Sequence, residues 1–76
     1  MSKYEKELYE VVQHINKTLN TDKYYVQFAY GEPRLEVYTH GTCSESMSPR
    51  LPSKQLIAWM YAFLKGIDIG RESNSY

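Results

Sequence analysis

The side chains with the greatest chemical potential in this sequence are one cysteine and two histidines, Cys43, His40 and His14. Cys43 follows His40 by three residues across Gly41, so a turn could bring the thiol close to the imidazole. A nucleophilic cysteine also needs a group that orients its base, and no orienting Asp or Asn is identifiable. Zinc usually takes four ligands, so these residues fall short unless a second chain contributes. We therefore expect no enzyme activity, no metal and no cofactor.

A second candidate is an anion site at the beginning of the expected second helix. Arg50 and Lys54 flank Ser53, where that helix should start. Unpaired N–H groups at a helix N-terminus, together with two cations, can bind an anion. The alternative is two solvated charges beside a helix start.

The two helices that position these residues are indicated by hydrophobic periodicity. A first helix should begin at a capping box formed by Ser2 and Glu5 and end at residues 20–22. A second helix should run from about Ser53 to Ile69, with Ser53 as N-cap and Gly70 as its stop. The apolar stripe of the first helix comprises Tyr4, Leu8, Val11, Val12, Ile15 and Leu19. The stripe of the second is centred on Leu56, Met60, Phe63 and Ile67.

A β-hairpin is expected between the helices. Residues 24–30 alternate in polarity, and residues 35–40 read as the return strand after a turn over residues 31–34. In this register Phe28 pairs with Val37, and Tyr24, Val26, Phe28 and Tyr30 share the inner face. Residues 42–47 could add a third strand, and two prolines make residues 48–52 a loop.

These elements predict a single α+β domain over residues 1–70, followed by a flexible tail over residues 71–76. The expected order is α-β-β-(β)-α, with both helices packed on one face of a small antiparallel sheet. A chain of 76 residues has no room for a second core. Its longest apolar run, Leu56 to Leu64, is far too short to span a bilayer. No signal-peptide pattern is visible, and a single cysteine forms no intramolecular disulfide, so we expect a cytoplasmic protein without membrane contact.

The outer face of the hairpin lacks a predicted intramolecular cover, and one side of the second helix is shaped for a further contact. The outer face of the hairpin displays two tyrosines, which suit protein contacts and base stacking, although they could simply pack on each other. On the second helix, small residues at four-residue spacing, Ala58, Ala62 and Gly66, would let another backbone approach. We expect the first helix to pack there, with a dimer mate as the alternative. The residues expected to contact a partner are Tyr25, Gln27, Tyr38, His40, Ala58 and Ala62.

A nucleic-acid-binding module is the alternative function. The expected topology resembles that of double-stranded RNA-binding domains, which place a basic cluster at the start of their last helix. Stacking on Tyr25 and Tyr38, with Arg34, Arg50 and Lys54 on phosphates, would give affinity that falls with salt. Nine basic side chains balance nine acidic ones, however, and only Lys54 matches that cluster. Nucleic acid is therefore the less favoured partner.

Five short segments resemble small uncharacterised proteins encoded by phages and prophages of Gram-positive bacteria. They are Tyr30-Gly31, Arg34-Leu35, Ser48-Pro49-Arg50-Leu51, Lys54-Gln55-Leu56 and Ala62-Phe63-Leu64-Lys65-Gly66. The resemblance implies a phage accessory protein without enzyme activity, acting in the host cytoplasm. Several small anti-CRISPR proteins share an α-β-β-β-α arrangement, so inhibition of a host defence system is the expected role by analogy. Because DNA-mimicking inhibitors are strongly acidic and this chain is neutral, its mechanism would differ from theirs.

Overall fold

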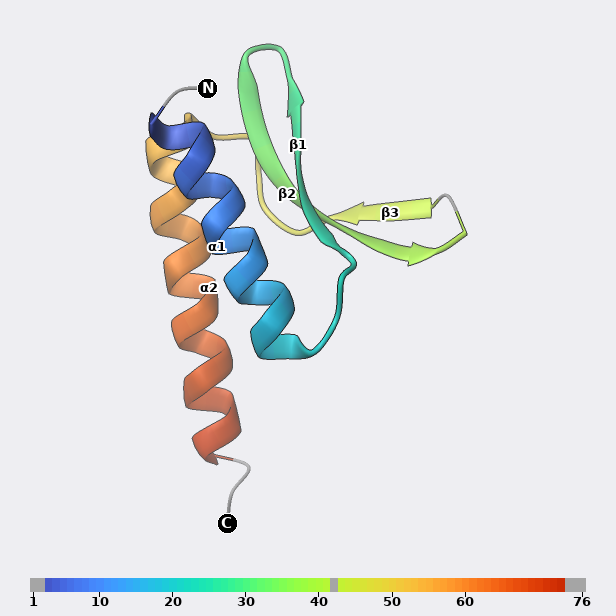
Figure 1. Cartoon of the computed structure of the whole chain (residues 1–76), viewed down its shortest axis with the longest axis vertical. Helices are drawn as coiled ribbons and strands as arrows, with labels where there is room; N and C mark the ends of the chain where they lie inside the picture. The colour runs from blue at the N-terminus through green and yellow to red at the C-terminus, as the bar shows by residue number, and fades with distance from the viewer. Residues whose placement is uncertain (1–2, 42, 74–76) are drawn as a thin grey trace.

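The structure, a computed structural model, describes residues 3–41 and 43–73. A helix is followed by a three-stranded antiparallel sheet of order β1-β2-β3 and a second helix. Both helices lie side by side on one side of the sheet (Figure 1), which confirms the predicted α+β class and its third strand. The elements are α1 (Lys3–Leu19), β1 (Tyr24–Ala29), β2 (Glu32–His40), β3 (Cys43–Ser46) and α2 (Ser53–Ser73).

The first helix forms as its apolar spacing predicts, except that Tyr4 of the expected stripe is exposed. Its buried residues are Leu8, Val11, Val12 and Ile15, one turn after another on the same face. The helix ends where Asn20 adopts a left-handed conformation (φ 53°) and the Thr21 N–H donates to the carbonyl of Asn16 at 2.9 Å. The predicted capping box includes Ser2, which lies outside the described residues.

The ends of the second helix differ from the prediction. The Leu56 N–H donates to the Pro52 carbonyl at 2.9 Å, so Pro52 occupies the N-cap position that was expected for Ser53. At the other end α2 continues through Gly70 to Ser73, so the predicted stop at Gly70 is wrong. A glycine ends a helix only when the backbone turns left-handed there, and Gly70 keeps a helical backbone. Residues 71–73, assigned to the tail, belong to the helix; residues 74–76 lie outside the described residues.

The hairpin forms with a different register from the predicted one. Its turn is the dipeptide Tyr30-Gly31, whose φ angles of 54° and 78° are typical of a type I′ turn. Phe28 therefore pairs with Pro33, and the predicted pairing of Phe28 with Val37 is wrong by four residues. Because four is an even shift, the strand residues keep their predicted faces. Tyr30 is the exception, since it lies in the turn and is 95% exposed.

Pro33, expected in the turn, is buried within β2. The Tyr38 N–H donates to the Lys23 carbonyl at 3.0 Å. The backbone N–H and C=O groups of even-numbered β2 residues therefore point toward β1, and those of odd-numbered residues point away from it. The missing N–H of Pro33 therefore costs no hydrogen bond between β1 and β2. Its carbonyl accepts the Leu51 N–H at 3.2 Å, which anchors the loop before α2.

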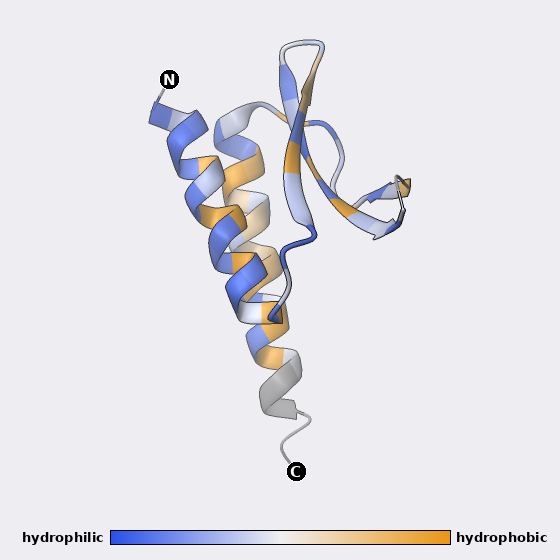
Figure 2. Cartoon of the chain, turned by 45° about the vertical axis from the view of Figure 1, so that its right-hand side comes forward, coloured by the Kyte–Doolittle hydropathy of each residue, from blue (hydrophilic) through white to orange (hydrophobic). Residues whose placement is uncertain are grey.

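A single hydrophobic core lies between the helices and the sheet. Figure 2 shows the apolar residues concentrated where the two layers meet. Within the described residues, β3 contacts β2 and neither helix, and all four of its residues are exposed. Figure 1 accordingly shows β3 projecting from the body of the protein. The buried core residues are Leu8, Val11, Val12, Ile15, Val26, Leu35, Leu56, Ile57, Met60 and Leu64.

Neither helix, over the described part of the chain, is long and apolar enough to cross a membrane. The 17 residues of α1 carry charged side chains along one face, and α2 spans 21 residues but mixes apolar and polar positions. The buried apolar residues of both helices belong to the core.

Candidate protein-interaction surface

A buried carboxylate organises the outer face of the sheet, the face opposite the helices. Glu36 is only 5% exposed. Its Oε1 accepts hydrogen bonds from the Tyr25 hydroxyl at 2.7 Å and the Ser44 hydroxyl at 3.2 Å. Its Oε2 accepts the Arg34 Nε–H and forms an ion pair with it. Burying a charge is costly unless it is paired and hydrogen-bonded, and both carboxylate oxygens of Glu36 meet that condition.

All three strands contribute to this group, which we call the Glu36 cluster: Tyr25, Arg34, Glu36 and Ser44. Tyr25 lies directly across from Glu36 in the β1–β2 register. Arg34 precedes Glu36 by two residues and therefore points to the same face of β2. Ser44, opposite Tyr38 in the β2–β3 register, is the diagonal neighbour of Glu36. The cluster exists because the register brings these four positions together.

The electrostatics of the cluster favour one protonation state. Burial raises the pKa of Glu36, but the hydrogen bonds from Tyr25 and Arg34, the Arg34 charge and the Ser44 hydrogen bond outweigh it and hold the pKa below its ordinary value. Ser44 lowers the pKa of Tyr25, whereas the hydrogen bond to Glu36, burial and the Glu36 charge raise it to a greater extent. Near neutral pH the pair is thus a phenol donating to a carboxylate. A carboxylate of lowered pKa is a weak base, so Glu36 suits structural organisation better than proton transfer.

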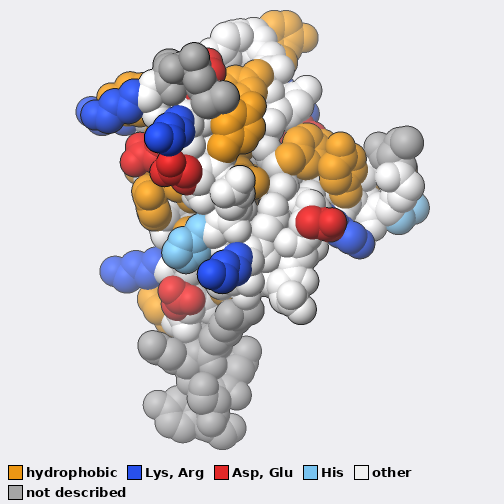
Figure 3. All heavy atoms as spheres, in the orientation of Figure 1, with side chains coloured by type: hydrophobic (Ala, Val, Ile, Leu, Met, Phe, Trp, Pro, Cys, Tyr) orange, Lys and Arg blue, Asp and Glu red, His pale blue; other side chains and the backbone are white. Residues whose placement is uncertain are grey.

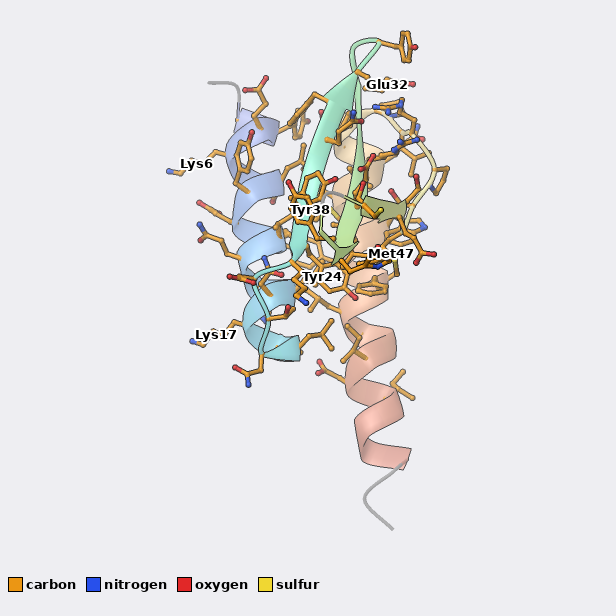
Figure 4. The ribbon with its side chains drawn as sticks, turned by 90° about the vertical axis from the view of Figure 1, so that its right-hand side faces the viewer. Lys6, Lys17, Tyr24, Glu32, Tyr38 and Met47 are labelled. Atoms are coloured by element: carbon orange, nitrogen blue, oxygen red, sulfur yellow. The ribbon has the colours of Figure 1, made fainter. Side chains whose placement is uncertain are left out.

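The cluster holds a pair of aromatic rings. Tyr25 and Tyr38 stack with ring centroids 4.6 Å apart and an interplanar angle of 26°. Tyr25 is fixed through its hydroxyl, while Tyr38 remains 47% exposed. Figure 4, in which the outer face of the sheet is toward the viewer, shows Tyr38 in front of the strands. The outer face therefore presents one exposed ring on a rigid support.

Arg50 fastens the loop before α2 to the hairpin. Its Nη2 donates to Gln27 Oε1 at 2.7 Å, and its Nη1 donates to the Glu32 carbonyl at 2.9 Å. The guanidinium also lies 5.8 Å from the centroid of the Tyr30 ring, within the range of a cation–π contact. The guanidinium of Arg50, which the predicted anion site required, is thus already bound within the chain. Lys54 is exposed. An anion site on Arg50 and Lys54 stays a prediction that this geometry does not favour.

The cysteine and histidines are dispersed. His40 and Cys43 are exposed partners at the end of the β2–β3 pair, where the register shifts. His14 lies on α1, beside a shallow open hollow that Asp68 of α2 also lines. In the described part of the chain no group of three His, Cys, Asp or Glu side chains is placed to hold a metal ion.

The small residues of α2 form a separate surface. Ala58, Ala62 and Gly66 are exposed, and the space next to the Gly66 Cα is open. The predicted packing of this line against α1 is therefore wrong, because α1 covers the other side of the helix. The residues expected to bind a partner thus divide between the outer sheet face (Tyr25, Gln27, Tyr38), the tip of β2 (His40) and this line (Ala58, Ala62).

The sequence did not predict that Arg34, Glu36 and Ser44 meet Tyr25, and it placed Tyr30 on the inner face instead of in the turn. The signal for the two-residue turn was weak, because type I′ turns favour asparagine, aspartate or glycine before the second glycine, and here tyrosine precedes Gly31. That turn places Tyr25 opposite Glu36. A carboxylate beside a tyrosine and an arginine on one strand face then predicts a hydrogen-bonded cluster.

Comparisons with known proteins do not assign a function to this surface. No family model matches the chain, and neither a curated protein nor a solved structure matches it. The resemblance to phage accessory proteins therefore stays a prediction.

Proposed function

We propose that this chain is a non-enzymatic protein-binding module whose partner binds the outer face of the sheet around Tyr38. The observation that supports the proposal is the stacked pair: an exposed Tyr38 ring rests on Tyr25, and Tyr25 is held by buried Glu36. Tyrosine is enriched at interface hot spots because it offers a large rigid area with a polar tip. A ring that is already ordered loses little conformational entropy on binding.

Protein is a better match than nucleic acid for this surface. Two of the three cations that a nucleic-acid interface would use are engaged inside the chain, Arg34 by Glu36 and Arg50 by the hairpin. The formal net charge is zero, so no long-range attraction to phosphates exists. Binding of labelled single- or double-stranded RNA or DNA at low ionic strength, weakening as salt is added, would contradict the proposal.

For the biological setting we propose a phage accessory protein acting in the cytoplasm of a bacterial host, with a host defence protein as the partner. The support is the sequence resemblance described above and the analogy in topology to small anti-CRISPR proteins. Expression of the chain should restore phage plating on strains that carry the targeted defence system. Failure to restore plating against every system tested would count against this setting while leaving protein binding itself open to the next experiment.

The binding surface is tested by affinity capture from host lysate, followed by titration of the purified partner with Tyr38→Ala. We expect this substitution to weaken binding about 30-fold, which corresponds to a hot-spot contribution of about 2 kcal/mol. The matched control is Tyr61→Ala, because Tyr61 is exposed to a similar extent (51% against 47%) but lies on α2. The control should leave affinity within about threefold of the unsubstituted chain.

Both variants should retain the circular dichroism spectrum, because neither tyrosine is buried. If the two substitutions weaken binding equally, or if Tyr38→Ala has no effect on a partner that binds the chain, the outer face is not the contact surface. If no host protein binds, the proposal of a protein-binding module fails as a whole.

A further inference from the structure

The outward edge of β1 carries backbone groups that no other part of the described chain satisfies. The hydrogen bond from Tyr38 to Lys23 shows that odd-numbered residues of β1 pair with β2. The N–H and C=O groups of Tyr24, Val26 and Phe28 therefore point away from the sheet. Unpaired edges of this kind are templates for another strand.

The chain itself closes the first of these three positions. The Asn16 side chain donates Nδ2–H to the Tyr24 carbonyl and accepts the Tyr24 N–H at Oδ1, both at 3.0 Å. This amide occupies the place that a neighbouring strand would take at Tyr24. The edge that remains open is thus the stretch from Val26 to Phe28, with two donors and two acceptors.

The two edges of the sheet differ in their protection. β3 is four residues long, carries the charged Glu45 and begins beside an irregularity in its register with β2. Short length, charge and bulges are the devices by which proteins blunt an edge. β1 has six residues, YYVQFA, without charge or proline. The stretch of this edge that Asn16 leaves open carries no charge, and such an edge favours pairing with another strand over exposure to water.

We propose that β1 pairs with β1 of a second copy, antiparallel, about a twofold axis at Gln27. In this register the open groups of Val26 meet those of Phe28 in the second copy, and the reverse pair forms by symmetry. All four open groups on each chain are then satisfied. A register centred on Val26 would instead require Tyr24, which Asn16 already occupies.

The side chains beside the edge agree with this register. On the helix-facing side, Val26 of one copy would lie across from Phe28 of the other. Phe28 is 41% exposed and Tyr9 of α1 is 43% exposed, with ring centroids 6.4 Å apart. Pairing would cover this aromatic surface, and Figure 3 shows apolar side chains at the surface between α1 and the hairpin. On the outer side the two Gln27 side chains would face each other, each accepting a hydrogen bond from Arg50 of its own chain.

The inference is independent of the proposed protein partner. Tyr38 lies on β2, the strand inside the β1 edge, and its exposed ring is on the outer face rather than at the pairing edge. Pairing would extend the sheet to six strands and place two copies of the Glu36 cluster on one continuous outer face. Loss of pairing and loss of partner binding are therefore measured by different variants, Phe28→Pro and Tyr38→Ala.

The test is the solution mass of the purified chain by light scattering over a range of concentrations. We expect a mass of twice 8.9 kDa for the unsubstituted chain and 8.9 kDa for Phe28→Pro. Proline at position 28 removes an outward N–H and leaves the ladder with β2 intact. The matched control is Ser46→Pro, which removes an outward N–H from the β3 edge and should remain dimeric. Circular dichroism verifies that each variant is folded.

The register is tested by cross-linking, with Cys43→Ser as background. Residues facing each other in a non-hydrogen-bonded antiparallel pair have Cα atoms about 4.5 Å apart, a separation that a disulfide can bridge. Gln27→Cys should therefore form a disulfide-linked dimer on mild oxidation, and Ser46→Cys should not. A monomeric unsubstituted chain at every concentration, a dimer that survives Phe28→Pro, or equal cross-linking at both positions would overturn the proposal. Capture of a strand from a different protein at this edge by a monomeric chain would also overturn it.

Discussion

At the scale of single residues, Glu36 determines the character of the outer face. It is a buried charge on a strand, and its cost is offset by donors from three strands. Those donors include the hydroxyl of Tyr25, the ring that supports Tyr38. The order of the exposed ring thus depends on a carboxylate that is itself hidden from solvent.

Replacement of this carboxylate should destabilise the protein. Glu36→Gln keeps the size of the side chain but removes the charge that Arg34 and Tyr25 engage, so we expect the free energy of unfolding to fall by about 1–3 kcal/mol. Urea unfolding followed by circular dichroism measures the change. The control is Glu45→Gln, an exposed position on β3 where we expect less than about 0.5 kcal/mol. Unfolding of both variants at the same urea concentration as the unsubstituted chain would contradict the role given to Glu36.

The same residue predicts a pH dependence. The folded-state pKa of Glu36 lies below the ordinary value of 4.5, so the unfolded chain takes up a proton more readily than the folded chain. Its contribution to stability is therefore complete above pH 4.5 and is lost as the pH falls through the lower folded-state pKa. The difference in unfolding free energy between the unsubstituted chain and Glu36→Gln, measured from pH 7 to pH 3, should shrink at the acid end. A difference that is constant over this range would show that ionisation of Glu36 does not stabilise the fold.

At the scale of elements, the tight turn of the hairpin decides which side chains meet. Tyr30 and Gly31 both have positive φ angles, a conformation that glycine adopts freely and tyrosine seldom does. The turn is supported from outside, because Arg50 binds the Glu32 carbonyl and lies against the Tyr30 ring. The loop before α2 therefore helps to hold the register that assembles the Glu36 cluster.

Two glycine substitutions should have opposite effects on stability. Gly31→Ala forces a side chain into the left-handed region, with an expected cost of about 1–2 kcal/mol. Gly66→Ala lies in the helical part of α2 with open space around it, and should stabilise by about 0.5–1 kcal/mol. Thermal unfolding of the two variants and of the unsubstituted chain measures whether each substitution raises or lowers stability. Two changes of the same sign would mean that the turn or the helix differs from the one described.

At the scale of the whole molecule, the protein consists of a helix-covered part and a projecting part. Both helices, β1 and the adjoining portion of β2 share one core, whereas β3 is held by β2 alone within the described residues. Ser44 is the side chain that ties β3 to the Glu36 cluster. Local stability should therefore fall from the core toward β3.

Hydrogen exchange can measure this gradient at two adjacent amides. In the observed registers the Glu36 N–H faces β1 and the Val37 N–H faces β3. The Val37 amide should exchange when β3 opens locally. We expect its exchange rate to exceed that of the Glu36 amide by on the order of tenfold or more. Equal protection of the two amides would mean that β3 opens only together with the core.

Local periodicity in the sequence was sufficient for the fold class. Apolar residues at three- and four-residue spacing predicted both helices, and the alternation over residues 24–30 predicted β1 and its inward residues. The assignment of strand faces survived a register error because side chains in a strand alternate with a period of two. The sequence alone therefore determined the central buried residues of both helices and that Tyr25 and Tyr38 share the outer face, but not the burial of Pro33 and Glu36.

The tertiary structure decided which polar groups meet. The register depended on a turn whose tyrosine adopts an uncommon conformation, and the position of Arg50 depended on a loop crossing to a hairpin 18 to 23 residues away in sequence. The open edge of β1, closed at Tyr24 by Asn16, followed from the packing of α1 against the sheet. Periodicity reports how often a residue faces the core, but hydrogen bonds need specific atoms within about 3 Å of each other, and three-dimensional packing sets those distances.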